Sequence, residues 1–140
     1  MTSHAKRFEY AISLDRDGGM LAEGEAPLSP GPEWTPEHLL LGALARCTLT
    51  SLRFHAKRQG VTVVASGEAT GAVTLREDEG RFGLVEARAR FEIELTPLPQ
   101  EEALDKLIAR AEHDCFVGAS IKPTTAYEWV VNGKPYTRPD

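Results

Sequence analysis

The chain has 140 residues, of which 41% are hydrophobic and 26% are charged, and its formal net charge at pH 7 is −5. This length is typical of one domain with a buried core. The negative charge and the lack of a basic stripe argue against a nucleic-acid partner. The N-terminus lacks the apolar region of a secretory signal, and charges interrupt the longest apolar run before it could span a membrane. We therefore expect a single domain over residues 1–140 in the cytoplasm, with no nucleic-acid and no membrane partner.

The N-terminal part of the chain predicts a short β-hairpin. Residues 7–14 place apolar side chains at every second position, which is typical of a strand. Residues 15–19, DRDGG, predict a turn, because glycine can adopt positive φ. Residues 20–26 predict a weaker return strand, so that Arg16 lies at the tip of the hairpin. A loop rich in proline and glycine follows over residues 27–32.

A long helix is predicted over residues 35–60. Thr35 can act as its N-cap, and Pro36 then falls at the first helical position, where a missing N–H costs nothing. Glu37 places a carboxylate in the first turn, and Gly60 can take the left-handed conformation after the last turn. These signals frame a helix of about 36 Å at a rise of about 1.5 Å per residue.

The front half of this helix, residues 39–44, is apolar on nearly all sides, and Cys47 follows at mid-length. A helix that is apolar all round needs burial on every side. One sheet of this chain covers only one side, so we expect a partner chain to cover the rest.

In the remaining segments, strands and helices do not alternate one by one. In chain order they are a strand over residues 61–75, a polar turn over 76–81, a strand over 82–95, a helix over 100–113, a short apolar turn over 116–120, a strand over 126–131, and a turn at Asn132 and Gly133. Apolar and charged side chains alternate from Val85 to Leu95, which indicates one buried and one solvated face. This order predicts an α+β fold with a mostly antiparallel sheet and a long central helix.

The two cysteines lie 68 positions apart, each in a specific setting. Cys47 is in the middle of the long helix, while Cys115 comes at a junction of helix and loop, where the backbone can move. A fixed thiol and a mobile thiol suit a redox pair, in which the first sulfur attacks and the second resolves the sulfenic acid. Thr50 and Ser51 follow Cys47 at i+3 and i+4, a spacing at which their hydroxyls could approach its sulfur.

Other interpretations of these residues remain open at this point. Buried cysteines often only pack in a core. Arg46, next to Cys47, is of a kind that usually lies solvated on a helix surface. His55 is rotated about 80° from Cys47 around the helix, which argues against a Cys–His pair. Cysteines and histidines at close spacing are too few for a zinc site.

The helix of residues 35–60, TPEHLLLGALARCTLTSLRFHAKRQG, resembles the central helix of the OsmC/Ohr family of thiol-dependent peroxidases. In that family a Pro-Glu pair opens the helix, and the reactive cysteine lies ten residues after the glutamate. Glu37 and Cys47 have this separation.

A second family mark is a cysteine just after the next helix, in a segment resembling A-x-x-x-C-P-x-S. Residues 111–120, AEHDCFVGAS, have Cys115 at this place. Phe116 and Gly118 depart from the usual proline and serine. The order of elements also fits, so the resemblance covers essentially the whole chain.

The resemblance implies a single OsmC-like domain that forms an intertwined homodimer, with active sites at the subunit boundary. Cys47 would reduce organic hydroperoxides to alcohols and then form a redox-active disulfide with Cys115, which an external dithiol reduces. Arg16, or Arg46 as the alternative, would contact the reactive sulfur, and Glu37 would orient that arginine. Glu37 is about 15 Å up the helix from Cys47, so it would serve the partner's site.

This chemistry needs no metal and no cofactor such as haem or flavin, and it would give the protein an antioxidant role in the stress response. Apolar side chains near the site would favour alkyl hydroperoxides, and the candidates are Trp34, Leu40, Leu44 and Phe116. The alternative is an OsmC-like stress or small-molecule-binding protein with little peroxidase activity. A third interpretation is a structural module with inert buried thiols.

Overall fold

The computed structural model of the chain describes residues 5–23 and 26–139. The chain divides into two compact units, the first ending at Pro36 and the second beginning at Glu37. In chain order the elements are β1 (Ile12–Leu14), β2 (Met20–Ala22), α1 (Pro36–Arg58), β3 (Thr62–Arg76), β4 (Arg81–Thr96), α2 (Glu101–His113), α3 (Phe116–Ser120), β5 (Thr125–Val131) and β6 (Lys134–Tyr136).

The first unit contains an antiparallel hairpin of β1 and β2. The carboxylate of Asp15 accepts hydrogen bonds from the backbone N–H of Asp17 at 2.9 Å and of Gly19 at 2.8 Å, and Gly18 has a φ of 85°. These contacts close the predicted turn and leave Arg16 exposed within it.

Both strands of this hairpin are shorter than predicted. The paired residues are Ile12 with Ala22, Ser13 with Leu21, and Leu14 with Met20. A strand extends only as far as its hydrogen-bonded partner, so the apolar alternation over residues 7–11 is not enough to form one. Residues 24 and 25 of the predicted return strand lie outside the described residues.

The second unit has a four-stranded sheet in the order β3-β4-β5-β6. β3 pairs antiparallel with β4, β4 pairs parallel with β5, and β5 pairs antiparallel with β6. The parallel pair arises because α2 and α3 lie between β4 and β5 in the chain and return it to the same end of the sheet. The prediction of an α+β fold with a mostly antiparallel sheet is therefore confirmed.

Three details of this unit differ from the predictions. Residues 116–120 form a short helix, α3, rather than a turn. The turn at Asn132 and Gly133, with φ values of 49° and 80°, leads into a further strand, β6, which lies beyond the last predicted strand. Val85 is partly exposed because the register shifts there, so that Glu86 and Leu84 pair with consecutive residues of β3 and leave Val85 as a bulge.

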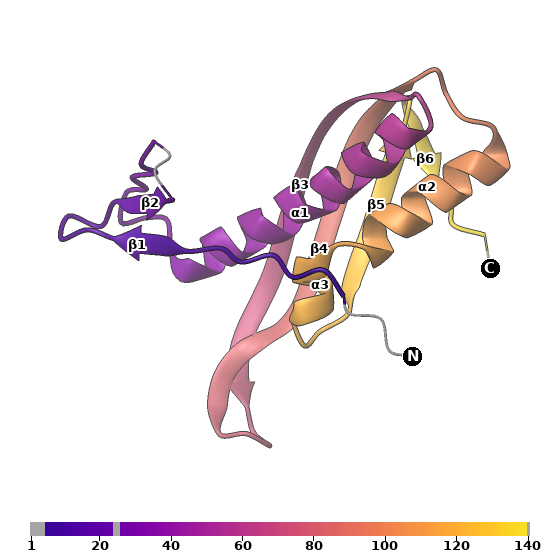
Figure 1. Cartoon of the computed structure of the whole chain (residues 1–140). Coiled ribbons are helices and arrows are strands. Elements are labelled where there is room, and N and C mark those ends of the chain that lie inside the picture. The colour runs from indigo at the N-terminus through magenta and orange to yellow at the C-terminus, as the bar shows by residue number, and fades with distance from the viewer. Residues whose placement is uncertain (1–4, 24–25, 140) are drawn as a thin grey trace. The chain divides into compact units, whose positions relative to one another are not determined.

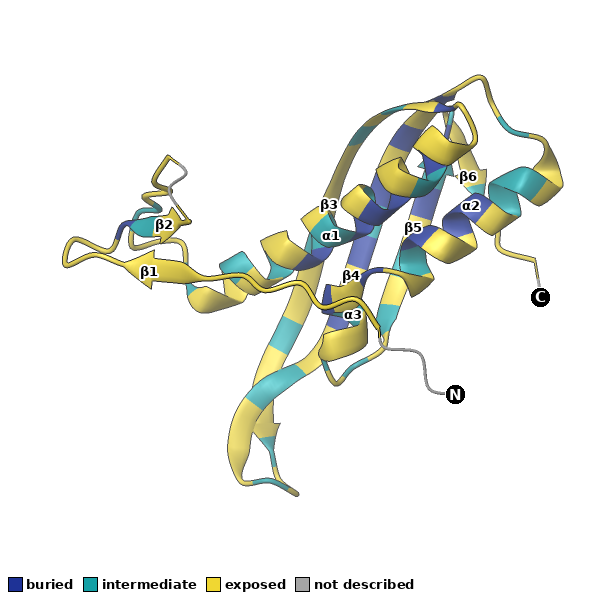
Figure 2. Ribbon diagram, viewed as in Figure 1, coloured by how far each residue is buried: buried dark blue, intermediate teal, exposed yellow. Residues whose placement is uncertain are grey.

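α1 and α2 lie against the same face of the sheet, as Figure 1 shows, and the core forms between them and the strands. Figure 2 shows this buried strip along β4 and β5. At its centre Phe91 is fully buried and packs against Trp129, with the rings tilted and their centroids 4.8 Å apart. The inward residues of β4 from Ala87 to Leu95 are buried as the alternation predicted, and charged residues occupy the other face.

The long helix is confirmed as α1, and Gly60 has the positive φ expected after its last turn. One stripe of the helix faces the core, and its buried members are Leu44, Thr48, Ser51, Leu52 and Ala56. On other sides Leu40 and Phe54 stay exposed. The single chain thus leaves part of the apolar helix surface uncovered.

The core arrangement predicts that substitution of Phe91 changes the free energy of unfolding much more than substitution of Glu92, the next residue of the strand. Phe91→Ala removes a fully buried ring and leaves a cavity, so we expect a loss of about 4 kcal/mol in the free energy of unfolding. Glu92→Ala, on the opposite face of the same strand, should change it by less than about 0.5 kcal/mol. Urea unfolding checks both, and equal effects would contradict the assignment of the two faces.

Candidate functional site

The structure brings the two cysteines together. Cys47 lies at mid-length on α1, and Cys115 lies between α2 and α3, where it forms the N-cap of α3. Both are free thiols, and the Cys115 thiol is close enough to raise the pKa of Cys47. They share an apolar cluster that includes Leu44, Ala87 and Val117. Two residues that no local motif links therefore meet at one site.

The environment of Cys47 contains opposing effects on its acidity. Burial raises the pKa of the Cys47 thiol, and the Cys115 thiol adds to this rise. The backbone N–H of Val117 and, more weakly, that of Phe116 lower the pKa by donating to the sulfur. No cation, Arg46 included, is among the main causes of the shift within the described part of the chain. By itself the described chain favours the thiol of Cys47 over its thiolate.

Cys115 is fully buried, with hydrogen-bonding groups around its sulfur. The backbone N–H of Gly118 donates to Sγ at 3.4 Å, and Oγ1 of Thr48 lies 3.4 Å from the same sulfur. A negative charge that develops on this sulfur therefore has donors in place, although no water reaches it.

The two departures from the family pattern have simple structural meanings. Phe116 is the first residue of α3 and offers an N–H toward Cys47, which proline in this position lacks. A Cβ added at Gly118 would lie 3.5 Å from the Tyr127 hydroxyl and 3.6 Å from the Cys115 sulfur, which is ordinary contact. A serine would thus begin in the same space, and Gly118 does not require a different loop.

The expectation that Thr50 and Ser51 approach Cys47 is wrong. Thr50 donates to the carbonyl of Arg46 at 2.8 Å, and Ser51 donates to the carbonyl of Arg110 at 3.3 Å. The hydroxyl that meets a thiol belongs to Thr48, and the thiol is that of Cys115.

The sequence does carry a signal for Thr48. It lies four residues after Leu44 and four before Leu52, so it occupies a polar position in the buried stripe of the helix. Its hydroxyl is also 3.1 Å from that of Tyr127 on β5. Burial raises the pKa of Tyr127 to about 12, although its hydrogen bond with Thr48 acts in the opposite direction.

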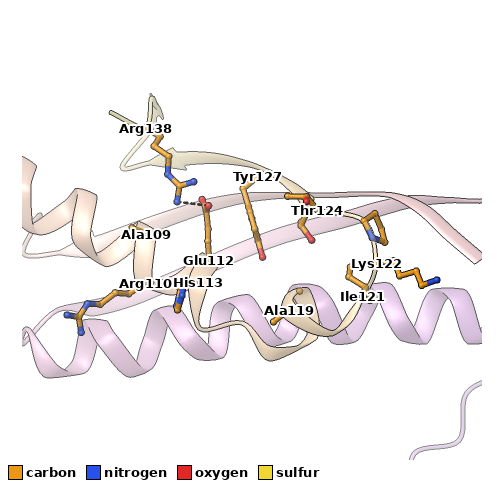
Figure 3. Close-up of a pocket in the computed structure, with 13 residues that line it drawn as sticks. Ala109, Arg110, Glu112, His113, Ala119, Ile121, Lys122, Thr124, Tyr127 and Arg138 are labelled. Carbon is orange, nitrogen blue, oxygen red and sulfur yellow. Dashed lines mark ion pairs between the residues drawn. The ribbon is translucent and has the colours of Figure 1, made fainter. Parts of the chain in front are cut away.

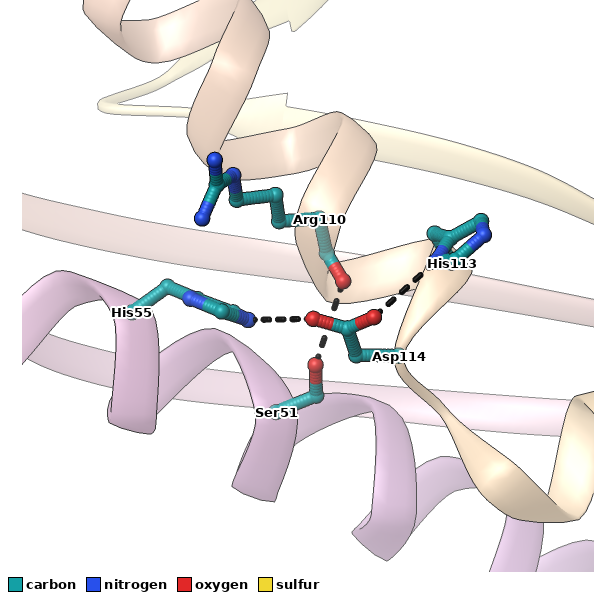
Figure 4. A network of polar contacts seen from close by, with 5 residues as sticks. All are labelled: Ser51, His55, Arg110, His113 and Asp114. Carbon is teal, nitrogen blue, oxygen red and sulfur yellow. Dashed lines mark hydrogen bonds and ion pairs between the residues drawn. The ribbon is translucent and has the colours of Figure 1, made fainter. Parts of the chain in front are cut away.

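A polar network ties α1 to the end of α2, directly before Cys115 (Figure 4). Nε2 of His55 lies 2.7 Å from a carboxylate oxygen of Asp114, and Nδ1 of His113 lies 2.9 Å from the other oxygen. Ser51 adds the bond to the carbonyl of Arg110. His55 therefore pairs with Asp114, and this tie holds the backbone that carries Cys115 against the helix that carries Cys47.

A groove of about 790 Å³ lies beside Cys115, between the end of α2, α3 and β5 (Figure 3). Gly118 and Tyr127 line it, together with charged side chains at its rim. One of these, Glu112, is paired with Arg138 at 2.6 Å and accepts from the indole N–H of Trp129.

The remaining predicted site residues lie apart from the cysteine pair or in the other unit. Glu37 is in the first turn of α1, about 15 Å along the helix axis from Cys47. Arg16 lies in the turn of the first unit, so its role at Cys47 stays a prediction. Of the four apolar candidates, Leu44 packs in the cysteine cluster, while the side chains of the other three are largely exposed: Trp34, Leu40 and Phe116.

The fold and the site define an α+β protein with a pair of adjacent free thiols, one partly exposed and one buried. The family model described as OsmC-like protein matches residues 29–130. Because this match covers more than half of the chain, the chain belongs to the OsmC family.

Solved structures of this family share the fold. An OsmC-like protein of unknown function from Vibrio cholerae is 16% identical, with a TM-score of 0.70 over 90% of this chain and 100% of that one. An organic hydroperoxide resistance protein from Elizabethkingia anophelis is 19% identical, with a TM-score of 0.63 over 94% and 100%. The organic hydroperoxide resistance protein OhrB of Bacillus subtilis is 19% identical, with a TM-score of 0.54 over 86% and 96%.

No curated protein sequence matches the chain. Among the described residues, none of the helices combines the length and the apolar character that crossing a membrane requires.

The network around Asp114 predicts a pH-dependent contribution to stability. His113 and then His55 lower the pKa of the Asp114 carboxyl, so the contribution is present above the unfolded pKa of about 3.9 and is lost as the pH falls through the lower folded value. Asp114→Asn should therefore lower the free energy of unfolding by about 0.5 kcal/mol at pH 5, because the carboxylate is half exposed and screened.

This difference should shrink as the pH falls below about 3.9 and through the lower folded pKa, as measured by urea unfolding at each pH. Glu94→Gln, an exposed carboxylate on β4, serves as the control and should show no such trend. A difference for Asp114→Asn that stays constant with pH would contradict the ion-pair assignment.

Proposed function

We propose that the chain is a thiol-dependent peroxidase that reduces organic hydroperoxides to alcohols. The observation that carries this proposal is the contact between a partly exposed Cys47 and a fully buried Cys115. A peroxide can reach the sulfur of Cys47, and the sulfur of Cys115 lies close by, shielded from solvent. Family relatives named as organic hydroperoxide resistance proteins support the same reaction class.

The proposed reaction has three steps. The Cys47 thiolate attacks one peroxide oxygen, the O–O bond breaks, and the departing alkoxide takes a proton to leave as an alcohol. The sulfenic acid formed at Cys47 then condenses with the Cys115 thiol, with formation of an S–S bond and release of water. An external dithiol reduces this disulfide by exchange and is itself oxidised to a disulfide. These steps need no metal, haem or flavin.

Charge stabilisation at Cys47 comes in part from the amides of Val117 and Phe116. These donors alone do not offset burial, which supports a role for a cation from outside the second unit. We assign this role to Arg16, oriented by Glu37. An arginine near the sulfur would lower the pKa of the thiol and stabilise the charge that develops on the peroxide.

The apolar setting of Cys47 supports an organic rather than an inorganic peroxide. Leu44 and Val117 pack in the cluster around the sulfur, with Leu84 and Ile121 at its edge. Such a surface has no hydrogen-bonding advantage for hydrogen peroxide, but it can bury the alkyl group of an organic hydroperoxide.

A homodimer would complete both the surface and the site. Large apolar side chains stay exposed in the single chain on α1 and on the far half of the β3–β4 hairpin: Leu40, Phe54, Val73, Leu75 and Phe82. Large exposed apolar side chains in such number favour an interface with another chain. In a dimer with paired α1 helices, Arg16 and Glu37 of one chain could act on Cys47 of the other.

We further propose that the two units act as one OsmC-like domain in the cytoplasm, since the family match runs across the boundary at Pro36. The alternative is a member of the fold with little peroxidase activity. The two proposals differ in whether peroxide oxidises Cys47 and Cys115 to a disulfide.

Cysteine substitutions test the reaction. Cys47→Ser should abolish the consumption of an alkyl hydroperoxide in the presence of a dithiol. Cys115→Ser should still consume one equivalent of peroxide and then accumulate a sulfenic acid, which dimedone traps at Cys47. In the wild type, mass spectrometry after mild peroxide should show Cys47 linked to Cys115 with the loss of two hydrogens. Full activity of Cys47→Ser would overturn the mechanism, and thiols that resist peroxide would favour the alternative.

Mixing a slow variant with an inactive one tests the dimer and the role of Arg16. Arg16→Ala should lower the rate about 10²-fold, a typical cost of losing a charge-stabilising donor. In mixed dimers of Arg16→Ala with Cys47→Ser, one site combines an intact arginine with an intact cysteine. Co-refolding should therefore restore about one quarter of wild-type activity, and a mixture that stays inactive, or a monomeric mass in light scattering, would refute the shared site.

A further inference from the structure

Thr48 is a polar side chain inside the apolar cluster, and it is fully buried. Its Oγ1 has three neighbours: the carbonyl of Leu44 at 3.0 Å, the hydroxyl of Tyr127 at 3.1 Å and Sγ of Cys115 at 3.4 Å. A hydroxyl has one hydrogen and two lone pairs. Thr48 can therefore accept from Tyr127 and direct its own hydrogen either to the carbonyl or to the sulfur.

Tyr127 extends this chain to the surface groove. Its ring runs from β5 toward α1, as Figure 3 shows, and both Tyr127 and Gly118 line the groove. The phenol oxygen lies 3.5 Å from the Cβ position of Gly118, so the polar chain ends beside the groove wall. With a pKa of about 12, raised by burial, Tyr127 keeps its proton at neutral pH and serves as a donor.

We propose that Thr48 and Tyr127 form the path by which the buried Cys115 exchanges its proton with solvent. This inference rests on the proposed function, because it concerns the steps in which Cys115 changes its protonation. The sulfur has no exposed surface, and an unpaired thiolate in an apolar cluster is costly. Its proton therefore has to arrive and leave through hydrogen-bonded neighbours.

In the reductive step, a thiolate of the external dithiol attacks the sulfur of Cys47, and Cys115 leaves as a thiolate. Cys115 takes the hydroxyl proton of Thr48, Thr48 takes that of Tyr127, and Tyr127 is reprotonated by water in the groove. When the disulfide forms, the protons move in the opposite direction: the Cys115 proton leaves along the path, and the hydroxide lost from Cys47 takes a proton from solvent.

A helix threonine often bonds to the carbonyl four residues before it without any further role. Thr50 does so on the same helix, with the carbonyl of Arg46 at 2.8 Å. Thr48 makes the same bond but has the thiol and the phenol as additional partners. Thr50→Val is therefore the matched control for Thr48→Val, since both remove one hydroxyl and keep the shape of the side chain.

The experiment follows reduction of the Cys47–Cys115 disulfide, prepared with diamide so that no peroxide is needed. The rate with dithiothreitol is measured by thiol labelling, in H₂O and in D₂O. Thr48→Val and Tyr127→Phe should each slow reduction about tenfold, less than a full general-acid effect because a thiolate is a tolerable leaving group. Both should also reduce the solvent isotope effect of the wild type, while Thr50→Val and Thr48→Ser keep the rate and the isotope effect.

Wild-type rates and isotope effects in Thr48→Val and Tyr127→Phe would overturn the proposal. If Thr48→Val does not fold, the proposal is tested by Tyr127→Phe alone, and a wild-type solvent isotope effect in that variant overturns it. Failure of the proposed function gives a different result, since then the disulfide does not form in the wild type under peroxide even though diamide forms it.

Discussion

The packing of one face of α1 against the segment after α2 is the contact on which the rest of the site depends. Leu44 and Thr48 on this face lie against Cys115, and Val117 closes the cluster beside them. The contact buries one thiol completely, leaves the other partly open and places the amides of α3 against the sulfur of Cys47. Loss of this packing would separate the thiols, because nothing in the local sequence links them.

The site combines an apolar environment with a few well-placed polar groups. An unpaired buried hydroxyl costs about 1–3 kcal/mol, yet Thr48 and Tyr127 satisfy each other and approach the Cys115 sulfur. In the same cluster, burial disfavours a thiolate at Cys47, and amide donors oppose this effect only in part. The reactivity of both sulfurs thus depends on a small number of donors rather than on general polarity.

Two further features lie around the cysteine pair: the polar network at Asp114 and the exposed apolar side chains of α1. The first ties the end of α2 to α1 within the chain. The second includes Leu40 and Phe54 on α1, which stay exposed in the described chain. α1 is thus buried on one side against its own sheet and open on others.

The sequence alone determined the elements whose signals are local. The ends of α1, which runs from Pro36 to Arg58, could be predicted because its capping signals are specific, and the inward face of β4 could be predicted from strict alternation. The places of the two cysteines at a helix centre and a helix end suggested a redox pair only together with the family resemblance. Short strands such as β1 and β6 could not be bounded, because their lengths depend on partners distant in the chain.

Only the tertiary structure decided what surrounds the thiols. The sequence suggested Thr50 and Ser51 as neighbours of Cys47, since spacing within a helix is all that it displays. The observed contact joins Thr48 to Cys115 and Tyr127, which lie on three different elements. Such contacts depend on how a helix, a loop and a strand pack together, and that packing is a property of the whole core rather than of any one segment.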